Sequence, residues 1–125
     1  MLINAQSLFL KIDEVRLIAD IRCPTTICIT ETWLNDCIDS SLVNIHNYRI
    51  CRSDRNYRRG GGTAVFLQSD IIFAEISSDL CMLQDVDYLM LDVKSIGILL
   101  VCVYVPPSVS SDTLQCRSKL NKQLA

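Results

Sequence analysis

The stretch that decides the fold is Thr26–Leu34, which reads TICITETWL. Its first five residues are apolar or β-branched, which is typical of a strand buried within a sheet. Glu31 follows this run directly. Because α/β folds bind their ligands at the carboxyl ends of such strands, Glu31 is a candidate site residue. An ordinary solvated glutamate at a strand end is the competing interpretation.

The residues before this strand predict a short strand and a helix. Leu2–Asn4 reads as the end of a strand, Ser7 as a helix N-cap, and Pro24 as the stop of a helix that runs to about Ile21. Strand, helix and strand within about thirty residues form a βαβ unit, whose two strands are parallel. The spacing of four apolar residues predicts the buried face of the helix: Leu8, Ile12, Val15 and Ala19.

Asn4 follows the first strand of this unit as Glu31 follows the second. Taken alone, it is read more readily as a turn-forming asparagine. Two oxygen-bearing side chains at neighbouring strand ends nevertheless suit Mg²⁺, which takes one or two carboxylates and completes its shell with water and phosphate. The sequence therefore predicts a Mg²⁺ site that includes Glu31 and Asn4.

The remainder of the chain reads as strands joined by short connections. Short connections favour antiparallel neighbours, so we expect an α+β fold with a mixed, mostly antiparallel sheet. A closing helix is predicted from Ser110 or Ser111 through Leu120. The strand candidates are Tyr48–Ser53, Thr63–Gln68, Ile71–Ile76, Val86–Val93 and Ile98–Val105.

Composition limits the class of protein. The 125 residues suit one domain, half of them are hydrophobic, and the net charge is −2. Seven cysteines, an odd number without CxxC spacing, indicate reduced and mostly buried thiols. The N-terminus lacks the pattern of a signal peptide, and the longest apolar run, Ile98–Val105, is too short to span a membrane. We expect an intracellular protein, nuclear or cytoplasmic, that is not secreted and has no membrane partner.

A basic cluster stands out against this acidic background. Arginine binds phosphate through paired hydrogen bonds, so the cluster is a candidate nucleic-acid-binding surface, although a solvated face is an equally good interpretation. Trp33 is read more readily as a core residue than as a platform for stacking bases. The cluster consists of Arg49, Arg52, Arg55, Arg58 and Arg59.

The order of these features resembles the endonuclease/exonuclease/phosphatase superfamily, and more narrowly the apurinic-type endonuclease domain of non-LTR retrotransposons. Each piece is weak alone, but five in this order cover nearly the whole chain. They are Ile3–Leu8 with Lys11–Glu14, Ile27–Leu34, Tyr48–Arg52 with Asp54 and Arg55, Gly60–Val65, and Val103–Pro107.

The resemblance implies a Mg²⁺-dependent phosphodiesterase acting on DNA. It assigns Glu31 to the metal, Asn4 to the metal and the phosphate, and Tyr104 to the scissile phosphate, with Asn4 and Tyr104 as catalytic residues. The family's Asp-x-Asn and Ser-Asp-His motifs follow the tyrosine strand, and residues 107–125 contain neither. The single histidine, His46, lies elsewhere in the sequence.

The missing motifs lead to three further expectations. We expect half of a four-layer α/β sandwich, a single partial domain over residues 1–125 that ends before the second sheet. We expect this chain alone to be inactive, because the general base is missing. An open sheet face would also favour self-association. The alternatives are a noncatalytic nucleic-acid-binding module and a scaffold or interaction domain.

Overall fold

The computed structural model describes residues 1–56, 59–76 and 86–107. These residues form seven strands, one α-helix and one short 3₁₀ helix, so the α+β class with its N-terminal βαβ unit is confirmed. The closing helix predicted from Ser110 or Ser111 lies outside the described residues. The elements are β1 (Leu2–Asn4), α1 (Leu8–Arg22), β2 (Thr26–Thr30), η1 (Ser40–Val43), β3 (Tyr48–Ser53), β4 (Thr63–Gln68), β5 (Phe73–Glu75), β6 (Asp87–Val93) and β7 (Ile98–Tyr104).

Helix α1 packs on the first sheet through the predicted face. Its buried residues are Leu8, Ile12, Val15 and Ala19, as the spacing predicts. Ser7 occupies the N-cap position, although its side chain makes no capping hydrogen bond. At the other end, Cys23 adopts a left-handed conformation and its N–H donates to the carbonyl of Ala19 at 2.9 Å. Pro24 cannot continue the helix, so the chain turns into β2 there.

The first sheet has the strand order β1-β2-β4-β3. β1 and β2 are parallel, with Asn4 in register with Thr30, whereas β4 is antiparallel to both β2 and β3. Because a crossover helix connects β1 to β2, both strands run in the same direction and end at the same edge of the sheet. This edge carries the candidate site.

Strand β4 is buried on both faces. Ala64 and Phe66 pack toward α1, whereas Val65 and Leu67 pack into a second apolar cluster on the opposite face. Alternate residues of a strand point to opposite faces, so each of these pairs belongs to a different core. A strand that is covered on both faces reads as a continuous apolar run, and this explains the sequence of Thr63–Gln68.

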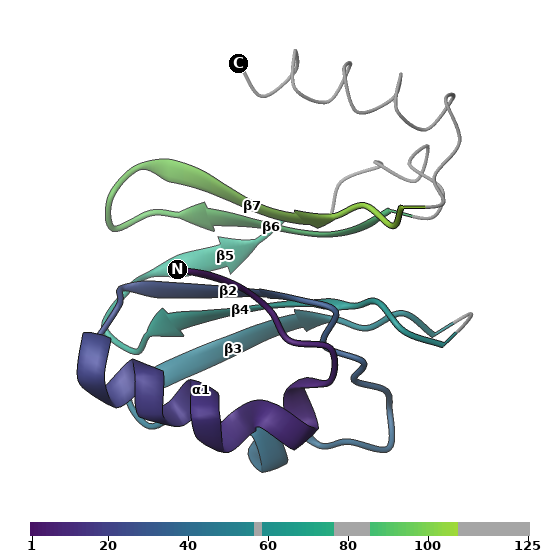
Figure 1. Cartoon of the computed structure of the whole chain (residues 1–125). Helices are drawn as coiled ribbons and strands as arrows, with labels where there is room; N and C mark the ends of the chain where they lie inside the picture. The colour runs from purple at the N-terminus through teal and green to yellow at the C-terminus, as the bar shows by residue number, and fades with distance from the viewer. Residues whose placement is uncertain (57–58, 77–85, 108–125) are drawn as a thin grey trace.

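A second sheet with the order β5-β6-β7 covers the face of the first sheet that α1 leaves open. In Figure 1, α1 lies below the four-stranded sheet, and β6 and β7 lie above it. The expected boundary before the second sheet is therefore wrong, and so is the open inner face that was expected to favour self-association. The two sheets close over each other through Leu67, Leu89, Leu91 and Cys102.

The division into two sheets corrects one further expectation. β4 and β5 are consecutive and joined by a short connection, yet they do not pair, because β5 pairs with β6 instead. Within that connection, the N–H of Ile71 donates to the carbonyl of Gln68 at 3.0 Å and closes a turn. The chain passes from the first sheet to the second at this turn.

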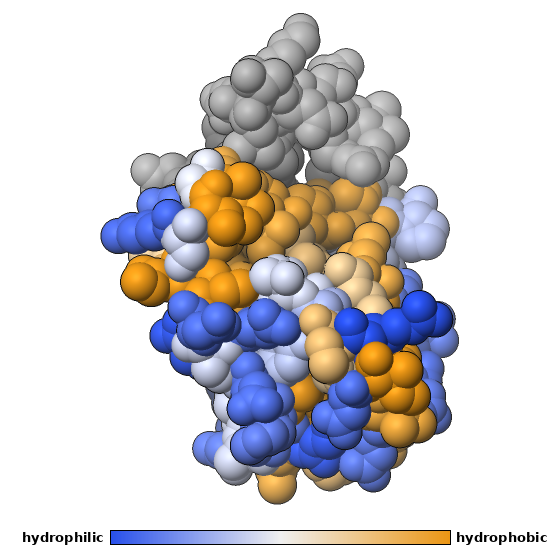
Figure 2. Space-filling model, turned by 90° about the vertical axis from the view of Figure 1, so that its left-hand side faces the viewer, coloured by the Kyte–Doolittle hydropathy of each residue, from blue (hydrophilic) through white to orange (hydrophobic). Residues whose placement is uncertain are grey.

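Apolar surface remains at one end of the second sheet. Figure 2 shows it gathered at the level of that sheet, with mostly hydrophilic surface below it. The exposed apolar side chains at this end flank the β6–β7 turn and the start of β5: Ile72, Ile96, Ile98 and Leu99. Among the described residues, no helix is long and apolar enough to cross a membrane.

Replacing Leu67 by alanine should destabilise the protein strongly, because Leu67 is fully buried between the sheets. We expect the free energy of unfolding to fall by about 2–5 kcal/mol, measured by urea titration. Leu10, on the exposed side of α1, is 78% exposed, and Leu10→Ala should change stability by about 0.5 kcal/mol or less. Equal effects of the two substitutions would contradict the two-sheet packing.

Candidate functional site

Two of the predicted site residues meet directly. The hydroxyl of Tyr104, at the end of β7, donates to Oε1 of Glu31 at 2.6 Å. Glu31 follows β2, so this contact joins the ends of strands from the two different sheets. The two residues are 73 positions apart in the sequence. Their contact places a carboxylate and a phenol at the same edge of the fold.

The backbone around Glu31 turns two side chains outward. Glu31 and Trp33 both have left-handed backbone angles, with φ of 52° and 55°, which are uncommon for residues other than glycine. Thr32 between them is fully buried. The N–H groups of Thr32 and Trp33 donate to the carbonyls of Gly62 and Gly61 at 3.3 and 2.9 Å. Strained residues of this kind concentrate at functional sites.

A buried ion pair supports this loop from the second sheet. Two of the three guanidinium nitrogens of Arg55, Nε and Nη2, donate to the carboxylate of Asp87, and the two side chains are only 5% and 9% exposed. Asp87 also accepts a hydrogen bond from the N–H of Gly62 at 3.2 Å. Asp87 lies opposite Tyr104 in the β6–β7 ladder. Its carboxylate therefore links the glycine turn to the strand pair that carries Tyr104.

No motif in the sequence points to Asp87. Its signal is a charged residue at the head of the apolar run of β6, a position where a carboxylate needs a partner once it is buried. The ion pair between Arg55 and Asp87 also requires a glycine at position 61. A Cβ on Gly61 would overlap the guanidinium of Arg55, and its φ of 67° also favours glycine.

The predicted arginine cluster does not form one phosphate-binding surface. Arg52 donates to both carboxylate oxygens of Asp54, at 3.0 and 2.7 Å, and to the carbonyls of Ile38 and Asn35. Arg55 is buried against Asp87. Both guanidinium groups are engaged by other parts of the protein, with 17% and 5% of their side chains exposed, and their role in binding nucleic acid stays a prediction.

Two other members of the cluster keep some exposure. Arg49 donates to the carbonyl of Ile71 and lies over the ring of Phe73, with 4.6 Å from Cζ to the ring centroid. Arg59 is exposed and lines a hollow beside the site. Arg58 lies outside the described residues.

A hollow beside the loop that follows β2 is lined by Trp33, Asn35, Arg59 and Gly60, among others. Trp33 is 42% exposed, so its interpretation as a core residue is wrong. Asn4 is also exposed at this edge, where its Cα is in register with Thr30, the residue before Glu31. The structure therefore brings Glu31 and Tyr104 into contact and places Asn4 and Trp33 at the same edge.

The magnesium site predicted from the sequence stays a prediction, and one buried hydroxyl at this edge bears on it. Thr63 Oγ1 is buried without a hydrogen-bond partner in the part of the chain that the structure describes. Thr63 lies level with Thr30 and on the same face of β4 as Val65, which faces the second sheet. A buried hydroxyl without a partner is a usual position for an ordered water or a hydrated ion. In the same described part, no group of three or more His, Cys, Asp or Glu could hold a metal, so the ion would need water and substrate oxygens.

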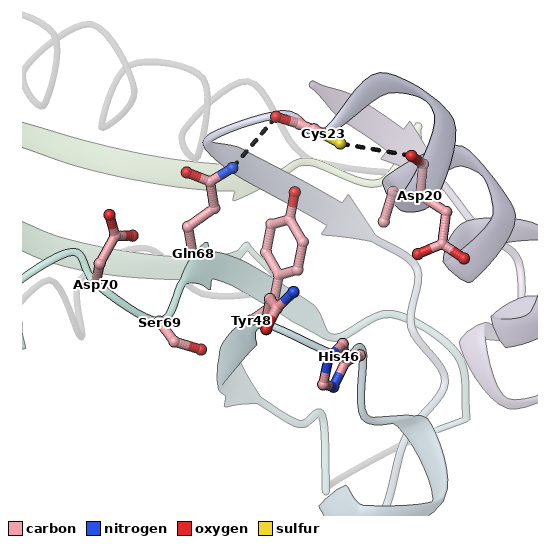
Figure 3. A pocket seen from close by; sticks show the side chains of 9 residues that line it. Asp20, Cys23, His46, Tyr48, Gln68, Ser69 and Asp70 are labelled. Carbon is pink, nitrogen blue, oxygen red and sulfur yellow. Dashed lines mark hydrogen bonds between the residues drawn. The ribbon is translucent and has the colours of Figure 1, made fainter.

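A second hollow lies at the other end of the first sheet, where β2 and β3 begin and β4 ends. It has a volume of about 340 Å³, and Figure 3 shows its side chains, including His46, Asp20 and Asp70. The side-chain amide of Gln68 donates to the carbonyl of Cys23 at 3.2 Å across its rim. His46 is thus at the edge of the sheet opposite Glu31 and takes no part in the candidate site.

The hydrogen bond to Glu31 raises the pKa of Tyr104 above the ordinary value of a tyrosine, with smaller contributions from burial and from the charge of Asp87. The bonded carboxylate favours the protonated phenol, because deprotonation would place two negative charges in contact. Tyr104 therefore remains a proton donor at neutral pH.

Glu31→Gln should lower the pKa of Tyr104, because a neutral amide replaces the carboxylate. Absorbance at 295 nm during an alkaline titration measures this, and subtracting the curve of Tyr104→Phe isolates Tyr104 from the other three tyrosines. The folded state is verified by circular dichroism at each pH. An unchanged midpoint in Glu31→Gln would show that the contact does not exist in solution.

Arg55→Met should destabilise the protein by about 3–5 kcal/mol, because it leaves the carboxylate of Asp87 buried without its counter-ion. Arg59→Met is the matched control and should change stability by about 0.5 kcal/mol or less, since Arg59 is exposed. The double variant Arg55→Met with Asp87→Leu should recover much of the loss. Urea unfolding of the four proteins decides between an essential ion pair and a dispensable one.

A known protein has a similar fold. No family model matches the sequence, and a search of curated proteins finds no match. A solved structure of an AP endonuclease from Archaeoglobus fulgidus is similar, with a TM-score of 0.63, 17% sequence identity, and coverage of 98% of this chain and 48% of that one. The chain thus spans about half the length of that protein. The likeness shows that these residues have an endonuclease-like fold.

Proposed function

We propose that this chain is part of a Mg²⁺-dependent phosphodiester hydrolase that acts on DNA, of the kind found in non-LTR retrotransposons. The contact between Tyr104 and Glu31 carries the proposal. A phenol held against a carboxylate at the carboxyl ends of strands is chemically suited to a metal-bound phosphate. The similarity to an AP endonuclease supports the class of fold, and the order of the sequence motifs supports the narrower family.

Glu31 and Asn4 are the residues that would hold Mg²⁺. Oε1 of Glu31 accepts from Tyr104, which leaves the second carboxylate oxygen as a ligand, and the amide oxygen of Asn4 lies on the neighbouring strand. Both are the hard oxygen ligands that Mg²⁺ prefers. When bound, the ion would supply positive charge to the phosphate oxygens.

The chain's own residues would position the nucleic acid. The raised pKa of Tyr104 keeps its hydroxyl protonated, so it can donate to a phosphate oxygen once substrate competes with Glu31. Trp33 offers an exposed ring for stacking on a base, and Arg59 on the same hollow offers positive charge to a neighbouring phosphate.

We propose that these residues do not cleave DNA by themselves. Hydrolysis requires a group that takes a proton from the attacking water. In the described part of the chain, the edge that carries Glu31 has no histidine, since His46 lies at the opposite edge. The carboxylate of Asp87 is held by Arg55 and Gly62 and is not available as a base.

Trp33 is the single tryptophan of the chain, so its fluorescence reports on this site. We expect duplex DNA to change that fluorescence more strongly with Mg²⁺ than with EDTA, because Glu31 and Asn4 would hold the ion and its positive charge would favour binding of the phosphate. Glu31→Gln should remove the Mg²⁺ dependence, whereas Glu14→Gln, on α1, should retain it. The affinity should fall with salt by about 0.9 log units per log unit of salt for each phosphate contact.

The other functions give different results in the same experiment. DNA binding that is the same with Mg²⁺ and with EDTA, and is unchanged in Glu31→Gln, would indicate a noncatalytic nucleic-acid-binding module. Absence of any DNA binding would indicate a scaffold or interaction domain. Incubation with supercoiled plasmid and Mg²⁺ should give no nicked product, and nicking that disappears in Glu31→Gln would show that these residues suffice for catalysis.

A further inference from the structure

Two cysteines from different sheets face each other in the core. Cys28 lies in β2 and Cys102 in β7, and both belong to the apolar cluster between the sheets. Cys102 is 3% exposed, whereas Cys28 is half-buried at the margin of the cluster. Both side chains line one hollow, and the sulfur of Cys102 lies 4.0 Å from the carbonyl oxygen of Ile29. Both thiols are free.

The two strands that carry these cysteines lie close together. Packed sheets usually lie about 10 Å apart. Here Cα atoms of β2 and β7 approach within 8 Å, which is closer than that spacing. Disulfides need Cα atoms about 4.4–6.8 Å apart, so the bridge requires β7, the edge strand of its sheet, to hold Cys102 within that distance of Cys28.

The pair can also be reached from solvent. A surface hollow is lined by both cysteines, of which Cys28 is the more exposed, and its other walls are formed by Met1, Leu2, Val101 and Val103. The hydrogen bond from Cys102 lowers the pKa of Cys28 to about 7, against the opposing effect of burial. The same hydrogen bond, together with burial, raises the pKa of Cys102. At neutral pH Cys28 therefore carries much of the thiolate character, and the thiolate is the reactive form.

We propose that Cys28 and Cys102 are a modification site that reacts with low-molecular-weight disulfides and closes into an intramolecular disulfide between the two sheets. The Cys28 thiolate attacks one sulfur of glutathione disulfide and releases a glutathione thiolate. The Cys102 thiol gives its proton to that thiolate and attacks the Cys28 sulfur, which releases a second glutathione. Two protein thiols are thereby oxidised and one glutathione disulfide is reduced.

The bridge would act on the strands that carry the candidate site. Cys28 is three residues before Glu31, and Cys102 is two residues before Tyr104. A covalent bond at this position fixes β7 against β2 next to the hydrogen bond between Tyr104 and Glu31. Oxidation would thus hold the two halves of the site together, whatever reaction the site performs.

The test incubates the folded 125-residue chain with glutathione disulfide, blocks the remaining thiols, and maps the proteolytic peptides by mass spectrometry. We expect a Cys28–Cys102 cross-linked peptide, lighter by two hydrogens than its separate parts, that dithiothreitol releases. Cys28→Ser and Cys102→Ser should each abolish it. Cys51→Ser is the matched control, because Cys51 packs against the same cluster from β3, and it should leave the cross-link intact.

Two outcomes would overturn the proposal. One is a Cys28 that remains unmodified, or stops at the glutathione adduct, while the exposed thiols of Cys23 and Cys37 react. The other is a cross-link that forms equally well in urea, since it would then owe nothing to the folded arrangement. Circular dichroism of each serine variant establishes that the loss of the cross-link does not come from unfolding.

Discussion

Between the two sheets, at the edge where the strands of the site end, the guanidinium of Arg55 and the carboxylate of Asp87 meet almost out of contact with water. Two charges in such a place are costly unless each satisfies the other. Asp87 also accepts a hydrogen bond from the N–H of Gly62. The carbonyls of Gly61 and Gly62 in turn accept hydrogen bonds from the loop that follows β2. The ion pair thus joins three segments that are remote in sequence, and the orientation of Glu31 depends on it.

Much of the fold was predictable because local periodicity determines it. The buried face of α1 follows from a helical repeat, and the two parallel strands follow from a helix placed between apolar runs. The division into two sheets was not predictable from these patterns. A short connection between β4 and β5 is compatible with a hairpin as well as with a crossing between sheets, and the choice depends on how Val65 and Leu67 pack against β6 and β7.

The candidate site, like the fold, was only partly predictable from the sequence. Glu31 could be found from its place after a buried strand, and Tyr104 from the resemblance to a family. The contact between them depends on the packing of one sheet on the other. The arginines illustrate the opposite error, because a run of like charges in the sequence suggests a common surface. In the fold, Arg52 donates to the carboxylate of Asp54, 2 residues away, and Arg55 donates to that of Asp87, 32 residues away.

The left-handed backbone at Glu31 and Trp33 has a consequence for how this protein tolerates change. Each such residue costs on the order of 1–3 kcal/mol relative to a relaxed conformation, and glycine removes most of that cost. Replacement of Glu31 by glycine would therefore relieve the backbone while it removes the carboxylate. At these two positions stability and the site therefore oppose each other, because the substitution that relaxes the backbone also removes the side chain that the site uses.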